Sequence, residues 1–202
     1  MSSTNRGATR IEQDAYMTPC ESIHSLLDVL DYSMLGAYGF LEPCRGTGNI
    51  YHAIDAGWKK HAELSEGIDY LTTPFADVDY CITNPPFSLA LEFLEKSLAE
   101  CVSVIYLLRL NFLGAQSRRI FWQANRPSHV MVLPKRPVFA WTCKGHSKPK
   151  RKGCGWMFAP GSTDICPNCG GKVAAQTDSI EYAWFAWDRL GLVTLDPGVH
   201  VL

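Results

Sequence analysis

The chain has 202 residues, of which 47% are hydrophobic and 19% are charged, and its formal net charge at pH 7 is -1. This length fits one globular domain with a proper core and room for a small insertion. Because the net charge is close to zero, no global field draws the protein to polyanions, so any contact with nucleic acid must come from local basic patches.

The N-terminal segment is polar and lacks the apolar region of a secretory signal. We therefore expect a cytoplasmic protein, in the host cytoplasm if a phage encodes it, with residues 1–13 as a flexible arm. An amphipathic helix is predicted at residues 22–30, where apolar residues recur at helical spacing. The most apolar stretch, residues 102–114, is interrupted by Arg109 and Asn111 and is too short to span a membrane.

Strands and helices are then predicted in alternation. A short strand at residues 37–41 precedes a glycine-containing turn and a helix at residues 50–56. The remaining elements are strands near 61–64, at 79–83, 102–108, 129–133 and 182–187, and helices at 89–100 and 118–125. This alternation predicts an α/β fold with a doubly wound, mostly parallel sheet. The last two strands, separated by a cysteine- and lysine-rich excursion, can form an antiparallel hairpin at the sheet edge.

The turn Glu42-Pro-Cys-Arg-Gly-Thr-Gly lies between a predicted strand and a predicted helix. Gly46 and Gly48 allow positive φ and a close approach of the backbone to a ligand, and the carboxyl ends of strands are where α/β sheets bind ligands. Taken alone, a tight turn with two glycines explains the segment equally well, and the third glycine of the dinucleotide motif is missing. Glu63 could hold ribose hydroxyls and Asp69 an adenine amino group, although by themselves both read as surface acids.

The segment Asn84-Pro85-Pro86-Phe87 follows a predicted buried strand. Two prolines fix φ twice and remove two N–H donors, so we expect nearby carbonyls without neighbouring donors to point into a cleft. With the Asn84 side-chain oxygen they would accept both hydrogens of a base amino group and free its lone pair for methylation. Phe87 could stack on a base flipped out of a duplex. The alternative is a proline-capped turn with a core phenylalanine.

Four segments together resemble the ordered motifs of class I amino-methyltransferases, most of all phage-type DNA N6-adenine methyltransferases. These segments are Tyr16-Met-Thr-Pro, Glu42-Pro-Cys-Arg-Gly-Thr-Gly-Asn-Ile, Glu63-Leu-Ser-Glu-Gly-Ile-Asp69 and Thr83-Asn-Pro-Pro-Phe. The resemblance covers most of residues 14–141 and 178–190. It implies S-adenosyl-L-methionine as the cofactor, a seven-stranded Rossmann-like sheet with a reversed final hairpin, and duplex DNA with a flipped target base as the partner.

The resemblance also implies roles for individual residues. Thr18 would hold the cofactor's carboxylate, Gly46 and Gly48 would pass its methionine part, Glu63 would bind the ribose and Asp69 the adenine. The full implied cofactor set is Tyr16, Thr18, Glu42, Pro43, Gly46, Gly48, Glu63, Asp69 and Asn84, and the implied catalytic set is Asn84, Pro85, Pro86 and Phe87. Cys44 departs from the family pattern, in which Phe or Ala is frequent. No target-recognition domain of the usual size is present, which predicts short or relaxed sequence specificity.

The stretch 142–177 is predicted to be a zinc-binding, basic insertion within the methyltransferase domain of residues 14–141 and 178–202. Cys166 and Cys169 have the spacing of a zinc knuckle, and Cys143 and Cys154 could complete a structural site of four thiolates. His146 is a rival ligand. Basic residues in this stretch, together with one from the preceding apolar strand, are predicted to contact nucleic acid: Lys148, Lys150, Arg151, Lys152 and Arg109.

The sequence therefore predicts methyl transfer to N6 of adenine in DNA. Two alternatives stay open, because a planar amino group is what the motif recognises. One is methylation of an RNA base or of a protein glutamine amide, and the other is a non-catalytic DNA-binding module.

Overall fold

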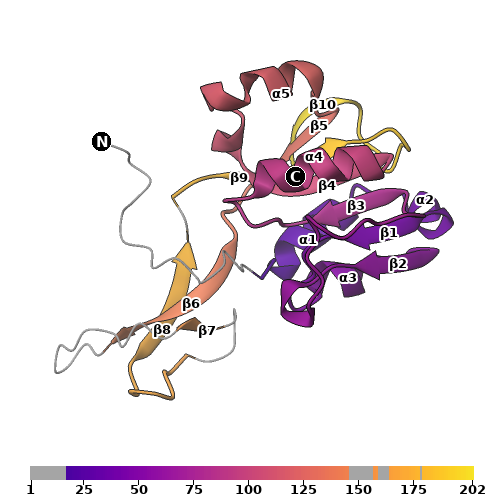
Figure 1. Ribbon diagram of the computed structural model, residues 1–202. Helices are drawn as coiled ribbons and strands as arrows, with labels where there is room; N and C mark the ends of the chain where they lie inside the picture. The colour runs from indigo at the N-terminus through magenta and orange to yellow at the C-terminus, as the bar shows by residue number, and fades with distance from the viewer. Residues whose placement is uncertain (1–16, 146–156, 159–163, 178) are drawn as a thin grey trace.

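The computed structural model describes residues 17–145, 157–158, 164–177 and 179–202. Its main body is a seven-stranded sheet with helices on both faces (Figure 1). The strands are β1 (Gly39–Glu42), β2 (Trp58–His61), β3 (Tyr80–Thr83), β4 (Ser103–Arg109), β5 (His129–Val132), β9 (Tyr182–Trp187) and β10 (Gly198–Val201). The helices are α1 (Cys20–Leu27), α2 (Tyr32–Ala37), α3 (Asn49–Ala53), α4 (Ala90–Glu100) and α5 (Arg119–Ala124), with short 3-10 turns η2 (Leu64–Glu66), η3 (Leu110–Phe112) and η4 (Gln116–Arg118).

The strand order is β10-β5-β9-β4-β3-β1-β2. All neighbouring pairs are parallel except those that β9 makes with β4 and β5. The doubly wound α/β class with seven strands is thus confirmed. The predicted hairpin of β5 and β9 is present but does not lie at the edge, because β10, which was not predicted from sequence, pairs with the outer side of β5.

The sheet has a separate apolar core on each face, because side chains alternate along each buried strand. On one face, Ile105 and Leu107 of β4 pack with α1, α2 and α3. On the other face, Val104, Tyr106 and Leu108 pack with α4 and with residues of α5. A strand buried on both sides reads as a continuous apolar run, which is why β4 was predictable from sequence.

A second, three-stranded antiparallel sheet extends from the main body between β5 and β9 (Figure 1). Its strands are β6 (Val138–Gly145), β7 (Met157–Phe158) and β8 (Lys172–Thr177), in the order β7-β6-β8. These strands were not predicted from sequence. Its buried cluster among the described residues consists of Cys143, Cys166 and Val173, with Trp141 packed against it.

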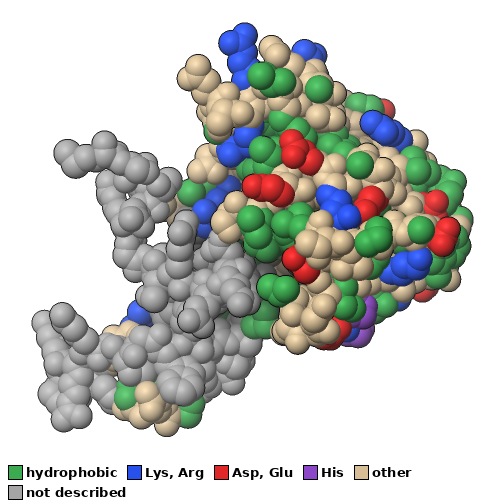
Figure 2. Space-filling model, in the orientation of Figure 1, with side chains coloured by type: hydrophobic (Ala, Val, Ile, Leu, Met, Phe, Trp, Pro, Cys, Tyr) green, Lys and Arg blue, Asp and Glu red, His purple; other side chains and the backbone are tan. Residues whose placement is uncertain are grey.

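Two surface properties follow from the described part of the chain. Every described helix is too short or too polar to reach across a lipid bilayer. On the face drawn in Figure 2, basic and acidic side chains are interspersed over the main body rather than separated into large patches, in keeping with the net charge of -1.

Candidate functional site

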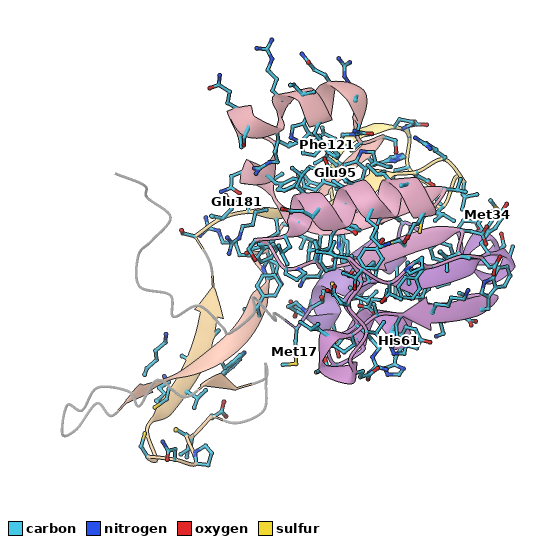
Figure 3. All side chains as sticks on the ribbon, viewed as in Figure 1. Met17, Met34, His61, Glu95, Phe121 and Glu181 are labelled. Atoms are coloured by element: carbon cyan, nitrogen blue, oxygen red, sulfur yellow. The ribbon has the colours of Figure 1, made fainter. Side chains whose placement is uncertain are left out.

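A cavity of about 640 Å³ lies where the carboxyl ends of neighbouring parallel strands meet. Its walls come from residues 17–18 before α1, the glycine turn after β1, the loop after β2 and the Asn-Pro-Pro-Phe corner after β3. Met17, labelled in Figure 3, marks the N-terminal wall. Of the residues predicted from sequence, the cavity brings together Thr18, Glu42, Pro43, Gly46, Glu63, Asp69, Asn84 and Pro86.

The two glycines of the turn have the positive φ values that were predicted, +53° for Gly46 and +84° for Gly48. Gly46 lines the cavity, and its N–H donates a hydrogen bond of 2.7 Å to Oε2 of Glu63. Gly48 is the N-terminal capping residue of α3 and, unlike Gly46, is not among the residues that line the cavity. A Cβ at Gly48 would come within 2.9 Å of the His52 ring, so both conformation and space favour glycine there.

Glu63 is held in place by hydrogen bonds to both of its carboxylate oxygens. Oε2 accepts from Gly46, and Oε1 accepts from the hydroxyl and the N–H of Ser65 at 2.7 and 3.1 Å. Desolvation opposes ionisation, but the hydrogen bonds from Ser65 and Gly46 and the charge of Arg45 outweigh it and lower the pKa of Glu63. The side chain is therefore an oriented anion at the cavity rim, with acceptor capacity left for ligand hydroxyls.

Glu42 is the buried acid of the cavity, with 2% of its surface exposed. Its Oε2 atom is buried and has no hydrogen-bond partner among the described residues. Desolvation raises the pKa of Glu42 to about 9, against weaker opposing effects of a Tyr51 backbone hydrogen bond and the charge of Arg45. A buried acceptor without a partner is costly, and a ligand that brings a cationic or N–H group into the cavity would satisfy it.

The Asn-Pro-Pro-Phe corner is tied to the glycine turn by Cys44. The Cys44 thiol lies 3.0 Å from the hydroxyl of Thr83 and donates to the backbone carbonyl of Asn84 at 3.3 Å. Burial raises the pKa of Cys44, so the thiol keeps its proton and remains a donor. Cys44 thus joins the two motifs.

One expectation about this corner was wrong. The carbonyls were predicted to lack neighbouring donors, but the Asn84 carbonyl accepts from Cys44 and the Pro86 carbonyl accepts from the N–H of Leu89 at 3.0 Å. The prolines remove donors only within the segment, whereas these two donors come from a neighbouring loop and from the start of α4. Asn84 lines the cavity, so its side-chain oxygen is an acceptor that the corner can offer to a ligand in addition to these carbonyls.

Phe87 and Pro85 are near the cavity but not in its lining. Pro85 is buried, and Phe87 is half-buried under the guanidinium of Arg109, whose Cζ lies 4.4 Å from the ring centroid. Arg109 ends β4, as predicted, and its Nε donates to the hydroxyl of Tyr182 at 3.0 Å. Arg109 thus lies against the predicted base-binding residue.

Three of the four predicted metal ligands converge in the small sheet. The sulfur atoms of Cys143, Cys166 and Cys169 all lie within 4.8 Å of one another, with 3.4 Å between Cys143 and Cys169. Tetrahedral zinc with Zn–S bonds of about 2.3 Å requires sulfur separations of about 3.8 Å, so this donor set fits a soft cation such as Zn²⁺. The other predicted ligand, Cys154, and its rival His146 lie outside the described residues.

Several further predicted site residues also lie outside the described part of the chain. They are Tyr16 of the cofactor set and Lys148, Lys150, Arg151 and Lys152 of the nucleic-acid set.

Some residues that complete the cavity were missed from sequence. Asn49 lines it and donates from Nδ2 to the Thr18 carbonyl at 2.9 Å, which fastens the N-terminal wall to α3. Apolar walls come from Ile68, Leu71 and Phe93. A usable signal was present for two of these, because Ile68 and Leu71 flank the predicted acid Asp69 in sequence.

Comparisons with known proteins agree with this architecture. No protein-family profile matches the sequence, and no curated protein matches it significantly. Among solved structures, a Pyrococcus horikoshii protein described as a candidate RNA methyltransferase is similar, with a TM-score of 0.55 and 16% identity over 92% of each chain. At this identity the similarity shows the fold alone, a Rossmann-like α/β fold with a seven-stranded sheet.

Two weaker similarities carry no argument because their TM-scores are below 0.5. A dimethyladenosine transferase from Plasmodium falciparum has a TM-score of 0.39 and 12% identity, over 85% of this chain and 62% of that one. Protein 1320 of Thermoplasma acidophilum has a TM-score of 0.42 and 12% identity, over 82% and 85% of the two chains.

Proposed function

We propose that this chain is an S-adenosylmethionine-dependent methyltransferase that modifies the N6 amino group of adenine in DNA, with short or relaxed sequence specificity. The observation that carries the proposal is that Asn84 and Pro86 line the same cavity as Gly46, Glu63 and Asp69. The glycine turn and the Asn-Pro-Pro-Phe corner could each be an ordinary turn when taken alone. They face the same cavity at the ligand-binding edge of the sheet.

The residues of the cavity fit the cofactor. Glu63 is an oriented anion that can accept from ribose hydroxyls, and Asp69 can accept from the adenine amino group. Glu42 offers a buried acceptor atom that lacks a partner in the described structure, which suits the positively charged methionine end. When bound, the cofactor supplies a methyl group on a positively charged sulfur.

The Asn-Pro-Pro-Phe corner would handle the target base. Asn84 can accept a hydrogen of the amino group, which shifts the nitrogen toward tetrahedral geometry and makes its lone pair available. A new N–C bond then forms as the C–S bond breaks, and the positively charged nitrogen releases its extra proton to water. No strongly basic side chain is needed, in keeping with a neutral Asn84. Phe87, oriented by Arg109, would pack against the flipped base.

The cysteine cluster is proposed to hold a structural zinc ion. Its thiolates lie away from the cavity, on the small sheet, and the donor set is that of closed structural sites. The small sheet has only a few buried apolar side chains of its own among the described residues, so a metal would supply much of its folding free energy.

A transfer assay with methyl-labelled S-adenosylmethionine tests the proposal. Unmethylated duplex DNA, single-stranded DNA, ribosomal RNA and a glutamine-containing protein are offered in parallel, and the products are digested and identified by mass spectrometry. N6-methyladenine from DNA is the expected product. Absence of transfer to all four substrates, with cofactor binding also absent, would refute the proposal.

RNA is the second candidate substrate. The Pyrococcus horikoshii protein with the similar fold is described as a candidate RNA methyltransferase, and the motif recognises a planar amino group rather than DNA as such. The same assay separates the two substrates, because label would then appear in a nucleoside that carries a 2′-hydroxyl.

A further inference from the structure

Three aromatic rings meet beside the Asn-Pro-Pro-Phe corner. Their centroids are 6.2 Å apart for Phe87 and Phe139, 5.7 Å for Phe87 and Tyr182, and 5.1 Å for Phe139 and Tyr182. Phe139 and Tyr182 are buried, with 5% and 1% of their surfaces exposed, whereas Phe87 is half-buried. Phe87 is therefore the most exposed ring of the three, close to the cavity although not in its lining, and the other two pack against it.

The three rings come from different parts of the molecule. Phe87 belongs to the corner after β3, Tyr182 begins β9 of the main sheet, and Phe139 lies on β6 of the small sheet. Arg109 adds a fourth contact, with its guanidinium over Phe87 and its Nε–H bonded to Tyr182. The small sheet thus packs directly against the residue proposed to hold the target base.

The same strand carries a metal ligand. Cys143 lies four residues after Phe139 on β6, which leaves the main body and runs along β8 (Figure 1). Cys143 pairs with Val173 of β8, and both are buried with Cys166. Phe139 packs in an apolar core of the main body, whereas Cys143 belongs to the small cysteine cluster, so β6 links the two, and whatever holds the cysteines together acts on Phe139 through this strand.

We infer that Phe139 is a positioning residue for the target base, which fixes the Phe87 ring and is itself held by the cysteine cluster through β6. The inference rests on the proposed function for its catalytic consequence, since Phe87 is taken to contact the base. The small sheet then has a part in catalysis. Metal bound at Cys143, Cys166 and Cys169 would hold the Phe87 ring in a fixed position beside the cavity.

Phe139→Ala is expected to lower the single-turnover rate of methyl transfer at least tenfold and to leave the dissociation constant for S-adenosylhomocysteine within twofold. Phe139→Leu, which restores most of the apolar volume, should recover most of the rate. Phe121→Ala on α5 is the matched control, because Phe121 packs on Trp122 in the other core, and should stay within twofold of wild type. Removing the metal with a chelator should mimic Phe139→Ala, and the two changes together should be no worse than either alone.

A direct readout does not depend on activity. The full chain with 4-fluorophenylalanine at position 87 should show a ¹⁹F resonance that shifts or broadens in Phe139→Ala and on chelation, but not in Phe121→Ala. An unchanged resonance in both cases would overturn the inference, as would strictly additive reductions in rate. If the wild type transfers no methyl group to nucleic acid, the proposed function fails, and the ¹⁹F measurement still decides whether Phe139 and the cysteines position Phe87.

Discussion

At the residue scale, the proposed chemistry depends on a neutral amide rather than on a base. Asn84→Ala removes the side-chain acceptor and keeps the two prolines, so we expect turnover to fall by roughly 100-fold or more, the size of effect seen when one preorganised hydrogen-bonding group is removed. Cofactor affinity should change by less than about threefold, because the other cavity residues remain. The measurement is single-turnover transfer together with calorimetric titration of S-adenosylhomocysteine.

Asn125→Ala is the matched control for this substitution. Asn125 follows α5, and its Nδ2 donates to the Phe121 carbonyl at 3.2 Å, remote from the cavity lining. It should keep wild-type turnover. Wild-type turnover in Asn84→Ala would show that Asn84 is not the acceptor for the amino group of the target base.

A second prediction at this scale concerns the pH dependence of stability. Because burial raises the pKa of Glu42 to about 9, the folded state favours its protonated form, and the stability this provides is complete below about pH 4.5 and is lost as pH rises toward 9. Glu42→Gln cannot ionise. Relative to the variant, the wild type should lose up to about 1.4 kcal/mol per pH unit across this window.

Thermal unfolding of both proteins without cofactor, from pH 4.5 to pH 9, measures the difference. Equal melting temperatures at pH 4.5 and a widening gap above it are expected. The same variant should bind S-adenosylmethionine roughly tenfold more weakly, because the cofactor's positive charge would favour the ionised form of Glu42 and pair with it, and glutamine has no ionised form. A gap that stays constant with pH would contradict the assignment of Glu42 as the buried titrating group.

At the scale of elements, the small sheet should depend on its cysteines while the main sheet does not. Cys166→Ser is expected to release the amides of β6 and β8 to fast hydrogen exchange and to abolish the proposed zinc binding, because Cys166 belongs to the buried cluster that the described residues form there. The amides of β4 and β9 should keep wild-type protection. Cys20→Ser, at an exposed cysteine on α1, is the control and should change neither readout.

The elements also show what sequence could and could not predict. β4 and α4 were found because one is a continuous apolar run and the other has apolar residues at helical spacing. β10 was missed because it is a four-residue edge strand whose two valines, Val199 and Val201, are exposed, so its apolar residues do not mark a face packed on the core. β6 and β8 were missed because their antiparallel pairing is not visible in sequence, although Phe139, Cys143 and Val173 on these strands are buried.

The candidate site, too, could be predicted from the sequence only in part. Gly46, Glu63 and Asn84 could be placed in one cavity because each follows a strand that pairs with its neighbour in the parallel sheet. The contact of Phe139 with Phe87 could not be predicted, since the two residues are 52 positions apart and belong to different parts of the fold. Motif reasoning identifies what binds a ligand, whereas packing across sheets determines what holds those residues in place.

At the scale of the whole molecule, a net charge of -1, with basic and acidic side chains interspersed on the face drawn in Figure 2, leaves any nucleic-acid affinity to local basic segments. The basic run in the insertion is the strongest such segment in the sequence. Reversing the charges of Lys150, Arg151 and Lys152 to Glu should weaken binding to a short DNA duplex. It should also reduce the slope of log affinity against log salt by up to about 0.9 for each phosphate that the variant no longer neutralises.

A control with the same change in net charge separates local binding from global repulsion. Arg119, Arg126 and Arg189 are exposed and have no ion-pair partner among the described residues, so reversing these three alters the overall field without touching the insertion. We expect this control to lower affinity less and to keep most of the salt slope, because the phosphates neutralised by the insertion would still release their counterions. Equal reductions in affinity for the two triple variants would mean that overall charge, and not the basic run, governs binding. An unchanged affinity in the first variant would mean that the phosphates are held elsewhere, with Arg109 beside the target-base corner as the next residue to test.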